Sequence, residues 1–369
     1  MVNIMAFNIW NNPHVDIYAL LRPILFLVEP ETAHALVIKA LQRGLGPHET
    51  LNENDPILKT KLFGLDFNNP IGLAAGFDKD AEAVNGSLDI GFGFAEFGCV
   101  TPLPQPGNPK PRVFRIPTAS AVITRMGANS RGTEIFARNL QAWKNSPDRI
   151  KRPVGANLSH NKNSSDEIGD LRTSLQRISP FVDFVTISLS RPNQKGNRDP
   201  LPKEDMIALL SKFTKIRDEL APNLPIIAKM SIDSNEDQQA DTASVTLNAG
   251  IQGLMIGGTS SSRPSNVPRN LVDEPGGLSG PPIFGPSTRI LSNMYKLTGG
   301  KLPLIGNGGI SSGADAYEKI RSGASLIQLY SALIFKGPGI VTNINKELAA
   351  LLRIDGFNSI SEAVGANHR

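Results

Sequence analysis

The sequence has a single cysteine, Cys99, among its 369 residues. One cysteine cannot form an intramolecular disulfide or supply a cysteine-rich zinc site, and no cluster of cysteine and histidine has the spacing of metal ligands. We therefore expect no metal. Because disulfides mark oxidising compartments, their exclusion makes the reducing cytoplasmic side the expected compartment.

The chain also lacks a run of lysine and arginine. Its formal net charge is +4 and its isoelectric point is near 9.1, a mild excess that an ordinary solvated surface explains. We therefore expect no nucleic-acid partner. Hydrophobic residues make up 40% and charged residues 20% of the chain, as in a folded globular protein. The length suits one large α/β domain with an attachment, or two small domains.

No apolar segment near the N-terminus is long enough to span a bilayer. Residues 17–28 are apolar but are interrupted by Arg22 and Pro23, whereas a span needs about 20 apolar residues. A basic stretch followed by a small-residue cleavage site is absent too, so we expect no signal peptide. Residues 31–43 have the spacing of an amphipathic helix that Gly44 closes, with an apolar face formed by Ala33, Leu36, Val37, Ala40 and Leu41.

Two short amphipathic helices in tandem are compatible with two roles. They can pack on a domain as a lid, or they can lie in the interface of a membrane. The residues alone favour neither role. We assign residues 1–46 to this helical segment and residues 47–369 to the main domain.

The main domain repeats short apolar, β-rich runs, each followed by a stretch with helical spacing. The runs are continuously apolar, which is typical of parallel strands covered on both faces. Eight such units in about 300 residues favour a closed (β/α)8 TIM barrel with a small N-terminal helical appendage. The Pro/Gly/Ser-rich stretch 260–287 is too long for a simple connector and is predicted to be an active-site loop. The predicted strands are 70–75, 93–100, 153–158, 181–189, 225–230, 251–257, 303–306 and 325–330.

The active site of such a barrel lies at the carboxyl ends of its strands. The seventh predicted strand leads into Gly308 and Gly309, and the eighth leads into Tyr330 and Ser331. Glycines also serve tight turns, but backbone N–H groups at this position, with a serine hydroxyl, favour a phosphate site. Lys229 ends the fifth strand. There it needs an anionic ligand, a flavin ring or a neighbouring carboxylate.

Several long segments resemble class 2 dihydroorotate dehydrogenases. The N-terminal PETAHALVIKAL (30–41) resembles the segment that marks the membrane-associated, quinone-using class. The resemblance covers nearly the whole chain. The segments within the barrel are NPIGLAAGFDKDAEAV (69–84), VTPLPQPGNPKPRVFRIP (100–117), GGLSGPPI (276–283) and SSGADAYEKIRSGASLIQLYSALIF (311–335).

The resemblance implies a flavoprotein of pyrimidine biosynthesis that is peripheral on the cytoplasmic face of the membrane. In this family FMN oxidises dihydroorotate to orotate by accepting hydride. Ubiquinone, which enters through a tunnel between the two N-terminal helices, then re-oxidises the flavin. The quinone entrance falls on His34, Arg115 and Tyr330. The flavin contacts fall on Ala74, Ala75, Gly76, Asn157, Lys229, Ser279, Gly280, Gly308, Gly309, Tyr330 and Ser331, with Cys99 in place of a family serine.

The substrate side departs from the family pattern. Three asparagines that hold the orotate ring in the family are Thr124, Ser188 and Gly258 here, and a nearby phenylalanine is Ala128. Each hydrogen bond that a buried polar substrate loses costs about 1–3 kcal/mol. The polar residues that match the family pattern are Lys79, Asn129, Asn193 and Thr259.

Arg191 occupies the position at which class 2 enzymes carry a catalytic serine that removes the substrate C5 proton. Arginine stays protonated in proteins and cannot act as that base. Ser190 is adjacent, but neighbouring residues of a strand face opposite ways, so it would substitute only if the loop rearranged. Losing a general base typically costs about 10²–10⁴-fold in rate.

These departures leave three hypotheses. The first is a dihydroorotate dehydrogenase with an unusual site. The second is an FMN oxidoreductase with a larger or more anionic substrate, for which Arg191 would be a bidentate anchor. The third is a flavin-binding scaffold without activity, against which the retained flavin positions argue.

Overall fold

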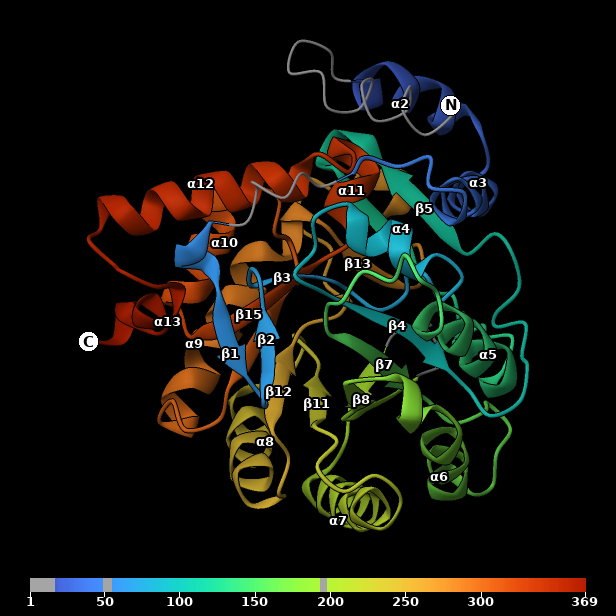
Figure 1. Ribbon diagram of the computed structural model, residues 1–369, viewed down its shortest axis with the longest axis vertical. Coiled ribbons are helices and arrows are strands. Elements are labelled where there is room, and N and C mark those ends of the chain that lie inside the picture. The colour runs from blue at the N-terminus through green and yellow to red at the C-terminus, as the bar shows by residue number, and fades with distance from the viewer. Residues whose placement is uncertain (1–16, 49–54, 193–197) are drawn as a thin grey trace.

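Eight parallel strands close into a barrel in the computed structural model, which describes residues 17–48, 55–192 and 198–369 (Figure 1). The order around the barrel is β11-β12-β14-β15-β3-β4-β7-β8. All eight strands predicted from the sequence are present, so the TIM-barrel prediction is confirmed. Their bounds are β3 Ile71–Leu73, β4 Phe94–Val100, β7 Val154–Leu158, β8 Phe184–Ser188, β11 Ile226–Met230, β12 Gly253–Ile256, β14 Leu304–Asn307 and β15 Ala324–Leu329.

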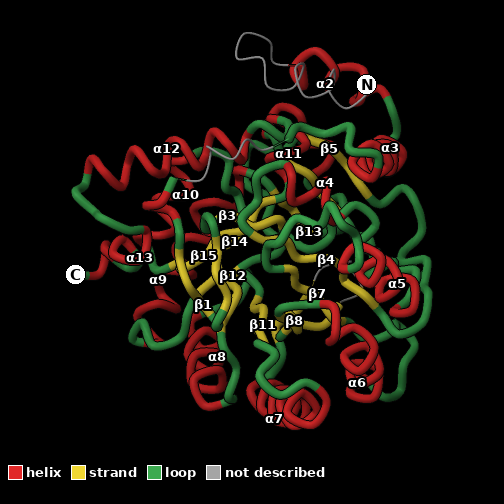
Figure 2. The backbone as a smooth tube through the Cα atoms, viewed as in Figure 1, coloured by secondary structure: helices red, strands yellow, loops and turns green. Residues whose placement is uncertain are grey.

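Helices form a layer around these strands (Figure 2). Side-chain caps stabilise the first turns of α6, α8 and α10. In α8, for example, Asn235 and Gln238 form a reciprocal capping box, which satisfies backbone N–H groups that have no partner within the helix. The helices of this layer are α4 Val84–Asp89, α5 Thr133–Lys144, α6 Glu167–Ile178, α7 Lys203–Leu220, α8 Glu236–Asn248, α9 Phe284–Thr298, α10 Gly313–Arg321, α11 Ser331–Lys336, α12 Ile340–Ile354 and α13 Ile360–Ala363.

Large apolar side chains fill the amino end of the barrel interior. Phe67, Phe94 and Phe184 belong to one buried cluster there. A Cβ atom on Gly72 of β3 would lie 2.2 Å from the ring of Phe94, so only glycine leaves room for this packing. The hairpin of β1 (Thr60–Leu62) and β2 (Leu65–Phe67) contributes to the cluster. This packing leaves ligand chemistry to the carboxyl end of the barrel.

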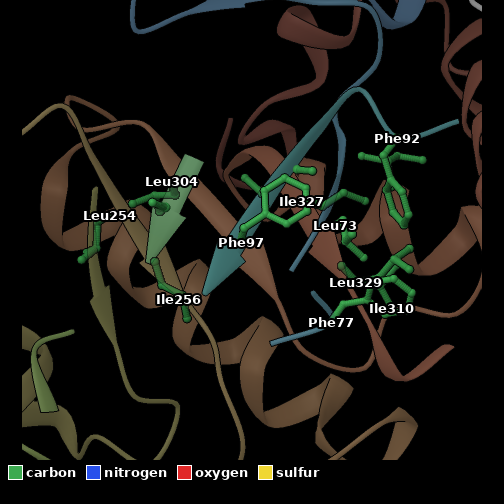
Figure 3. Close-up of a cluster of buried hydrophobic side chains, with 14 of the residues drawn as sticks. Leu73, Phe77, Phe92, Phe97, Leu254, Ile256, Leu304, Ile310, Ile327 and Leu329 are labelled. Carbon is green, nitrogen blue, oxygen red and sulfur yellow. The ribbon is translucent and has the colours of Figure 1, made fainter. Parts of the chain in front are cut away.

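Apolar side chains also cover the outside of the strands. Figure 3 shows Leu73 of β3 beside Ile327 and Leu329 of β15, and a second group formed by Leu254, Ile256 and Leu304. These side chains are 3% exposed or less. Apolar packing on both faces is the physical reason for the continuous apolar runs in the sequence.

Two further small antiparallel units supplement the barrel, and neither was predicted from the sequence. One is a sheet of β5 (Val113–Ile116), β6 (Ala121–Thr124) and β13 (Gly277–Ser279). The other is a hairpin of β9 (Ser190–Pro192) and β10 (Arg198–Pro200). Because β13 and the first turn of α9 fall within 260–287, the prediction of a single long loop there is only partly correct.

The predicted N-terminal helices are present as α2 (Ile17–Leu27) and α3 (Pro30–Gln42) (Figure 1). In α2, the Tyr18 hydroxyl donates to the Ile334 carbonyl at 2.6 Å and Arg22 donates to the Phe335 carbonyl at 2.7 Å. Both acceptors belong to α11. Among the described residues, no helix is long and apolar enough to cross a membrane. The domain boundary at residue 46 stays a prediction.

Helix α3 is fixed to the main domain by an ion pair. Arg112 donates to both carboxylate oxygens of Glu31 at 2.9 Å. It also donates to the carbonyls of Pro106 and Asn108 at 2.7 and 2.8 Å. The hydrogen bonds from Arg112 hold the pKa of Glu31 below its usual value. This arrangement fixes the helix beside the carboxyl end of the barrel.

Candidate active site

A cavity of about 970 Å³ extends from α2 and α3 to the carboxyl ends of the barrel strands. Almost all of the residues predicted from the sequence lie on its wall. The exceptions are Arg191 and Ala128, which are not among the lining residues, and Asn193, which lies outside the described residues. The predicted residues that line the cavity are His34, Ala74, Ala75, Gly76, Lys79, Cys99, Arg115, Thr124, Asn129, Asn157, Ser188, Lys229, Gly258, Thr259, Ser279, Gly280, Gly308, Gly309, Tyr330 and Ser331.

The glycine segment after β14 approaches the start of α9 closely. Gly308 and Gly309 have φ angles of +102° and +80°. A Cβ on Gly309 would lie 2.6 Å from backbone atoms of Phe284, so a side chain there is excluded. Nearby, the Ser331 hydroxyl donates to the Ser279 hydroxyl at 2.8 Å. Bare backbone, two hydroxyls and the N-terminus of α9 make a local environment suited to an anion.

A buried carboxylate lies between strands beneath the cavity, and sequence reasoning missed it. Glu96 of β4 is 0% exposed. It accepts hydrogen bonds from the side-chain amides of Asn157 at 2.9 Å and Gln328 at 2.7 Å. Since Asn157 donates its amide nitrogen to Glu96, its amide oxygen remains available to a ligand. A glutamate within the otherwise apolar run 93–100 was the signal that could have revealed this group.

Two lysines bring positive charge to the carboxyl end of the barrel. The ammonium of Lys79 donates to the side-chain oxygen of Asn129. Burial lowers the pKa of Lys79, as expected for an ammonium group removed from water. Lys229 of β11 is paired in register with Ser188 of β8. This end of the cavity therefore suits a ligand that is anionic or becomes anionic during reaction.

Ser190, and not Arg191, faces the cavity. The Ser188 and Ser190 hydroxyls lie 2.8 Å apart, and Ser190 is 6% exposed. Arg191 is exposed, and its guanidinium lies 2.9 Å from a carboxylate oxygen of Asp205 and 3.3 Å from one of Glu167. Neighbouring residues of β9 therefore face opposite ways, as expected, but Ser190 is the one that faces the cavity and Arg191 is the one that faces solvent. A role for Arg191 as a substrate anchor loses its geometric basis.

Aromatic rings lie where the cavity approaches α3. The rings of His34 and Phe77 are edge-to-face at 5.4 Å, and Tyr330 lies 5.5 Å from Phe77. Burial lowers the pKa of His34 and raises the pKa of Tyr330 to about 12. Both side chains are therefore neutral at physiological pH. A neutral aromatic passage suits an apolar, ring-shaped ligand.

Arg115 joins this passage to the end of α2. It donates to the carbonyls of Leu25 at 3.0 Å and Phe26 at 3.2 Å, and its guanidinium carbon lies 4.7 Å from the centre of the Phe26 ring. A cation at the carboxyl terminus of a helix interacts favourably with the helix dipole. Arg115 therefore positions α2 as part of the cavity wall.

No group of three or more potential metal ligands from histidine, cysteine, aspartate and glutamate occurs within residues 17–48, 55–192 and 198–369. The cavity wall offers hydroxyls, amides, ammonium groups and bare backbone, together with the His34 ring and carboxylates such as Asp78. Such a site can hold a flat phosphorylated cofactor beside a small polar substrate.

Comparison with known proteins leads to the family that the sequence motifs indicated. The family described as "Dihydroorotate dehydrogenase" matches residues 57–352. A match of this extent shows that the chain belongs to the dihydroorotate dehydrogenase family, as the sequence motifs indicated.

Similar proteins extend the match to the N-terminal helices. The chain is 44% identical to "Dihydroorotate dehydrogenase (quinone)" of Xanthobacter autotrophicus, over 96% of this chain and 100% of that protein. It is 43% identical to "Dihydroorotate dehydrogenase (quinone), mitochondrial" of Mus musculus, over 93% of this chain and 88% of that protein. The ligand-free enzyme of Eimeria tenella superposes with a TM-score of 0.85 at 34% identity, covering 92% and 99% of the two chains. The quinone-using class of the family is therefore the one that this chain resembles.

Proposed function

We propose that this protein is an FMN-dependent dihydroorotate dehydrogenase that oxidises dihydroorotate to orotate and passes the electrons to a ubiquinone-type acceptor. The observation that carries the proposal is the single cavity that joins the glycine segment after β14 to the aromatic passage at α3. One continuous space lets a flavin contact a polar substrate at the barrel and an apolar acceptor at the helices. The names of the relatives support both substrates.

The residues present fit flavin mononucleotide. The cavity volume of about 970 Å³ lies within the range of about 300–1,000 Å³ typical of ligand sites. Gly308, Gly309 and Ser331 would hold the phosphate. A Cβ on Gly76 would project into the open cavity, where it would meet only Tyr330, at 4.0 Å. The glycine therefore leaves that space to the ring. Asn157, oriented by Glu96, and Lys229 would bind polar atoms of the ring system.

The flavin, when bound, supplies the acceptor for the hydride from substrate C6. The C5 proton must be taken by this chain. Ser190 is the hydroxyl that would accept it, because it faces the cavity whereas Arg191 does not. A hydroxyl that accepts a proton must release its own. The Ser188 oxygen, 2.8 Å away, would receive that proton and pass its own to water in the cavity.

Substrate orientation falls to the polar residues opposite the flavin positions. Lys79 would pair with the dihydroorotate carboxylate, and Asn129, which accepts a hydrogen bond from Lys79, would fix the ammonium group. Thr259 and Thr124 would offer hydroxyls to the ring amides. These contacts replace some of the hydrogen bonds that family asparagines make.

The N-terminal helices would bring the quinone passage to a membrane surface. Leu20, Ile24 and Leu27 of α2 are 68%, 62% and 88% exposed. Exposed leucine and isoleucine on one short helix favour burial in the interfacial region of a bilayer. His34, Tyr330 and Arg115 would then line the path between that surface and the flavin. We place the protein on the cytoplasmic face of the membrane, peripherally bound.

Anaerobic mixing of the purified, flavin-loaded protein with dihydroorotate tests the proposal. We expect the visible absorbance of the flavin to bleach, and a short-chain ubiquinone added afterwards to restore it. A protein that binds FMN but is not bleached by millimolar dihydroorotate would contradict the assigned substrate. Bleaching without re-oxidation by the quinone would contradict the assigned acceptor only.

A further inference from the structure

Lys319 of α10 is a completely buried cation that the proposed reaction does not use. Its relative exposure is 0%. Within the described part of the chain, no carboxylate forms an ion pair with it, and its ammonium group instead donates to the Ser287 hydroxyl at 2.5 Å and lies 5.1 Å from the centre of the Phe284 ring. Burying an ammonium group without a carboxylate partner is costly. A group with this cost calls for an anion that the protein alone does not supply.

The hydrogen bonds of Lys319 lead to the wall of the cavity. Ser287 lies in the first turns of α9, and its hydroxyl oxygen is 3.0 Å from the carbonyl oxygen of Gly308. A Cβ on Gly308 would lie 3.2 Å from that same hydroxyl oxygen. Lys319 is therefore separated from the glycine segment by a single hydroxyl, on the side away from the cavity. Its stem packs against β14, where a Cβ on Gly306 would lie 3.4 Å from its Cδ.

The first turn of α9 reinforces this charge. Phe284 begins the helix, and its backbone is in contact with the position that a Gly309 side chain would take. The positive end of the dipole of this 15-residue helix therefore lies at the same glycine segment as the ammonium group. Two sources of positive potential converge on Gly308 and Gly309 from behind.

We propose that Lys319 is a positioning residue that serves as the buried counter-charge of the flavin phosphate at Gly308 and Gly309. The inference rests on the proposed function, because it takes the anion to be the phosphate of FMN. Lys319 would act through Ser287 and through its electric field, without touching the ligand. It would therefore determine the preference of the site for a phosphorylated flavin over one without phosphate.

Burial without an ion-pair partner has a measurable consequence. It lowers the pKa of Lys319 to about 7, and the charges of Asp315 and Glu318 only partly oppose this. In the flavin-free protein the ammonium group therefore destabilises the fold. A bound phosphate would convert this destabilising charge into a source of ligand affinity.

The test compares two ligands that differ only in the phosphate. Full-length protein freed of flavin is titrated with FMN and with riboflavin, and binding is measured by quenching of flavin fluorescence. The variants are Lys319→Met and, as a control, Lys296→Met, which removes an exposed lysine from the last turn of α9, the helix that carries Ser287. Thermal unfolding of each flavin-free protein is recorded in parallel.

We expect Lys319→Met to weaken FMN binding by at least about tenfold, because charges interact strongly where water is excluded. Riboflavin binding should change by less than about twofold, since riboflavin carries no anion. The flavin-free Lys319→Met protein should unfold at the same temperature as the unmodified protein or higher. Lys296→Met should leave both affinities unchanged.

Equal loss of both ligands, or no loss of FMN, would overturn the inference. Should Lys319→Met not fold, Lys319→Gln allows the same comparison while keeping a polar partner for Ser287. Failure of both variants to fold even with FMN present would assign the lysine a purely structural role and overturn the proposal. If the unmodified protein binds FMN no better than riboflavin, the phosphate site of the proposed function fails instead.

Discussion

Replacing Ser190 with alanine removes the hydroxyl of β9 that lines the cavity and lies 2.8 Å from the Ser188 hydroxyl. If Ser190 takes the C5 proton, the rate of flavin reduction by dihydroorotate should fall by about 10²–10⁴-fold, the usual cost of losing a general base. Flavin binding should be unaffected, because the glycine segment after β14 is untouched.

Two neighbouring substitutions set the scale for this loss. Ser188→Ala removes the hydroxyl 2.8 Å from Ser190. Because cavity water can then receive the Ser190 proton directly, the change should cost about fivefold, the value of one neutral hydrogen bond. Arg191→Ala breaks exposed ion pairs with Asp205 and Glu167. Each pair contributes at most about 1 kcal/mol to stability, and the rate of flavin reduction should hardly change. We therefore expect the Ser190 variant to be slowest by a wide margin.

Anaerobic stopped-flow absorbance measures the bleaching directly. Dihydroorotate deuterated at C5 adds a second readout, because slower proton removal should increase the isotope effect in Ser190→Ala. A structural role would lower the rate without changing the isotope effect. Bleaching of Ser190→Ala at the unmodified rate, or an equally large loss in Arg191→Ala, would refute the assignment.

Other predictions concern strain, anchoring and pH. Gly258→Asn, which restores a family residue, should not improve dihydroorotate affinity and should lower stability by about 1–3 kcal/mol in thermal unfolding, because Gly258 has a φ of +117°; a tighter substrate Kd would contradict this. Gly309→Ala should lower the flavin content of purified protein, measured by absorbance ratio, since its Cβ would meet Phe284 at 2.6 Å. Arg112→Ala should lower the free energy of unfolding by about 3 kcal/mol in urea, as expected for a broken, largely buried pair. Because the folded-state pKa of Glu31 is depressed, its contribution is present above the unfolded pKa and is lost as pH falls through the folded value; the Tm difference between the unmodified protein and Glu31→Gln should shrink on acidification.

The barrel could be predicted because its signals are local. Each strand carries enough consecutive apolar residues to identify itself, since both faces of a parallel barrel strand are buried. The turn after β14 was equally clear, because only glycine tolerates the φ of Gly308 and the contact of Gly309 with Phe284. Almost all of the residues that the family motifs placed in the site then lie on the cavity wall.

The hairpin after β8 could not be predicted in the same way. Whether Ser190 or Arg191 faces the cavity depends on carboxylates of α6 and α7, which hold the guanidinium outside. Those partners are distant in sequence or belong to another element. Alternation therefore predicted that the two residues face opposite ways, but not which of them faces the cavity. Asn193 lies outside the described residues, and its assignment stays a prediction.

The sequence by itself therefore determined the fold class, the family and the residue types available to a flavin and its substrate. Only the tertiary structure decided which side chains meet: Glu96 with Asn157 and Gln328, and Lys319 with Ser287 behind the glycine segment. The physical reason is that burial and charge pairing are properties of position in space. A lysine in the pattern of an amphipathic helix is exposed by default, and only the packing of α10 on the barrel makes Lys319 a buried charge.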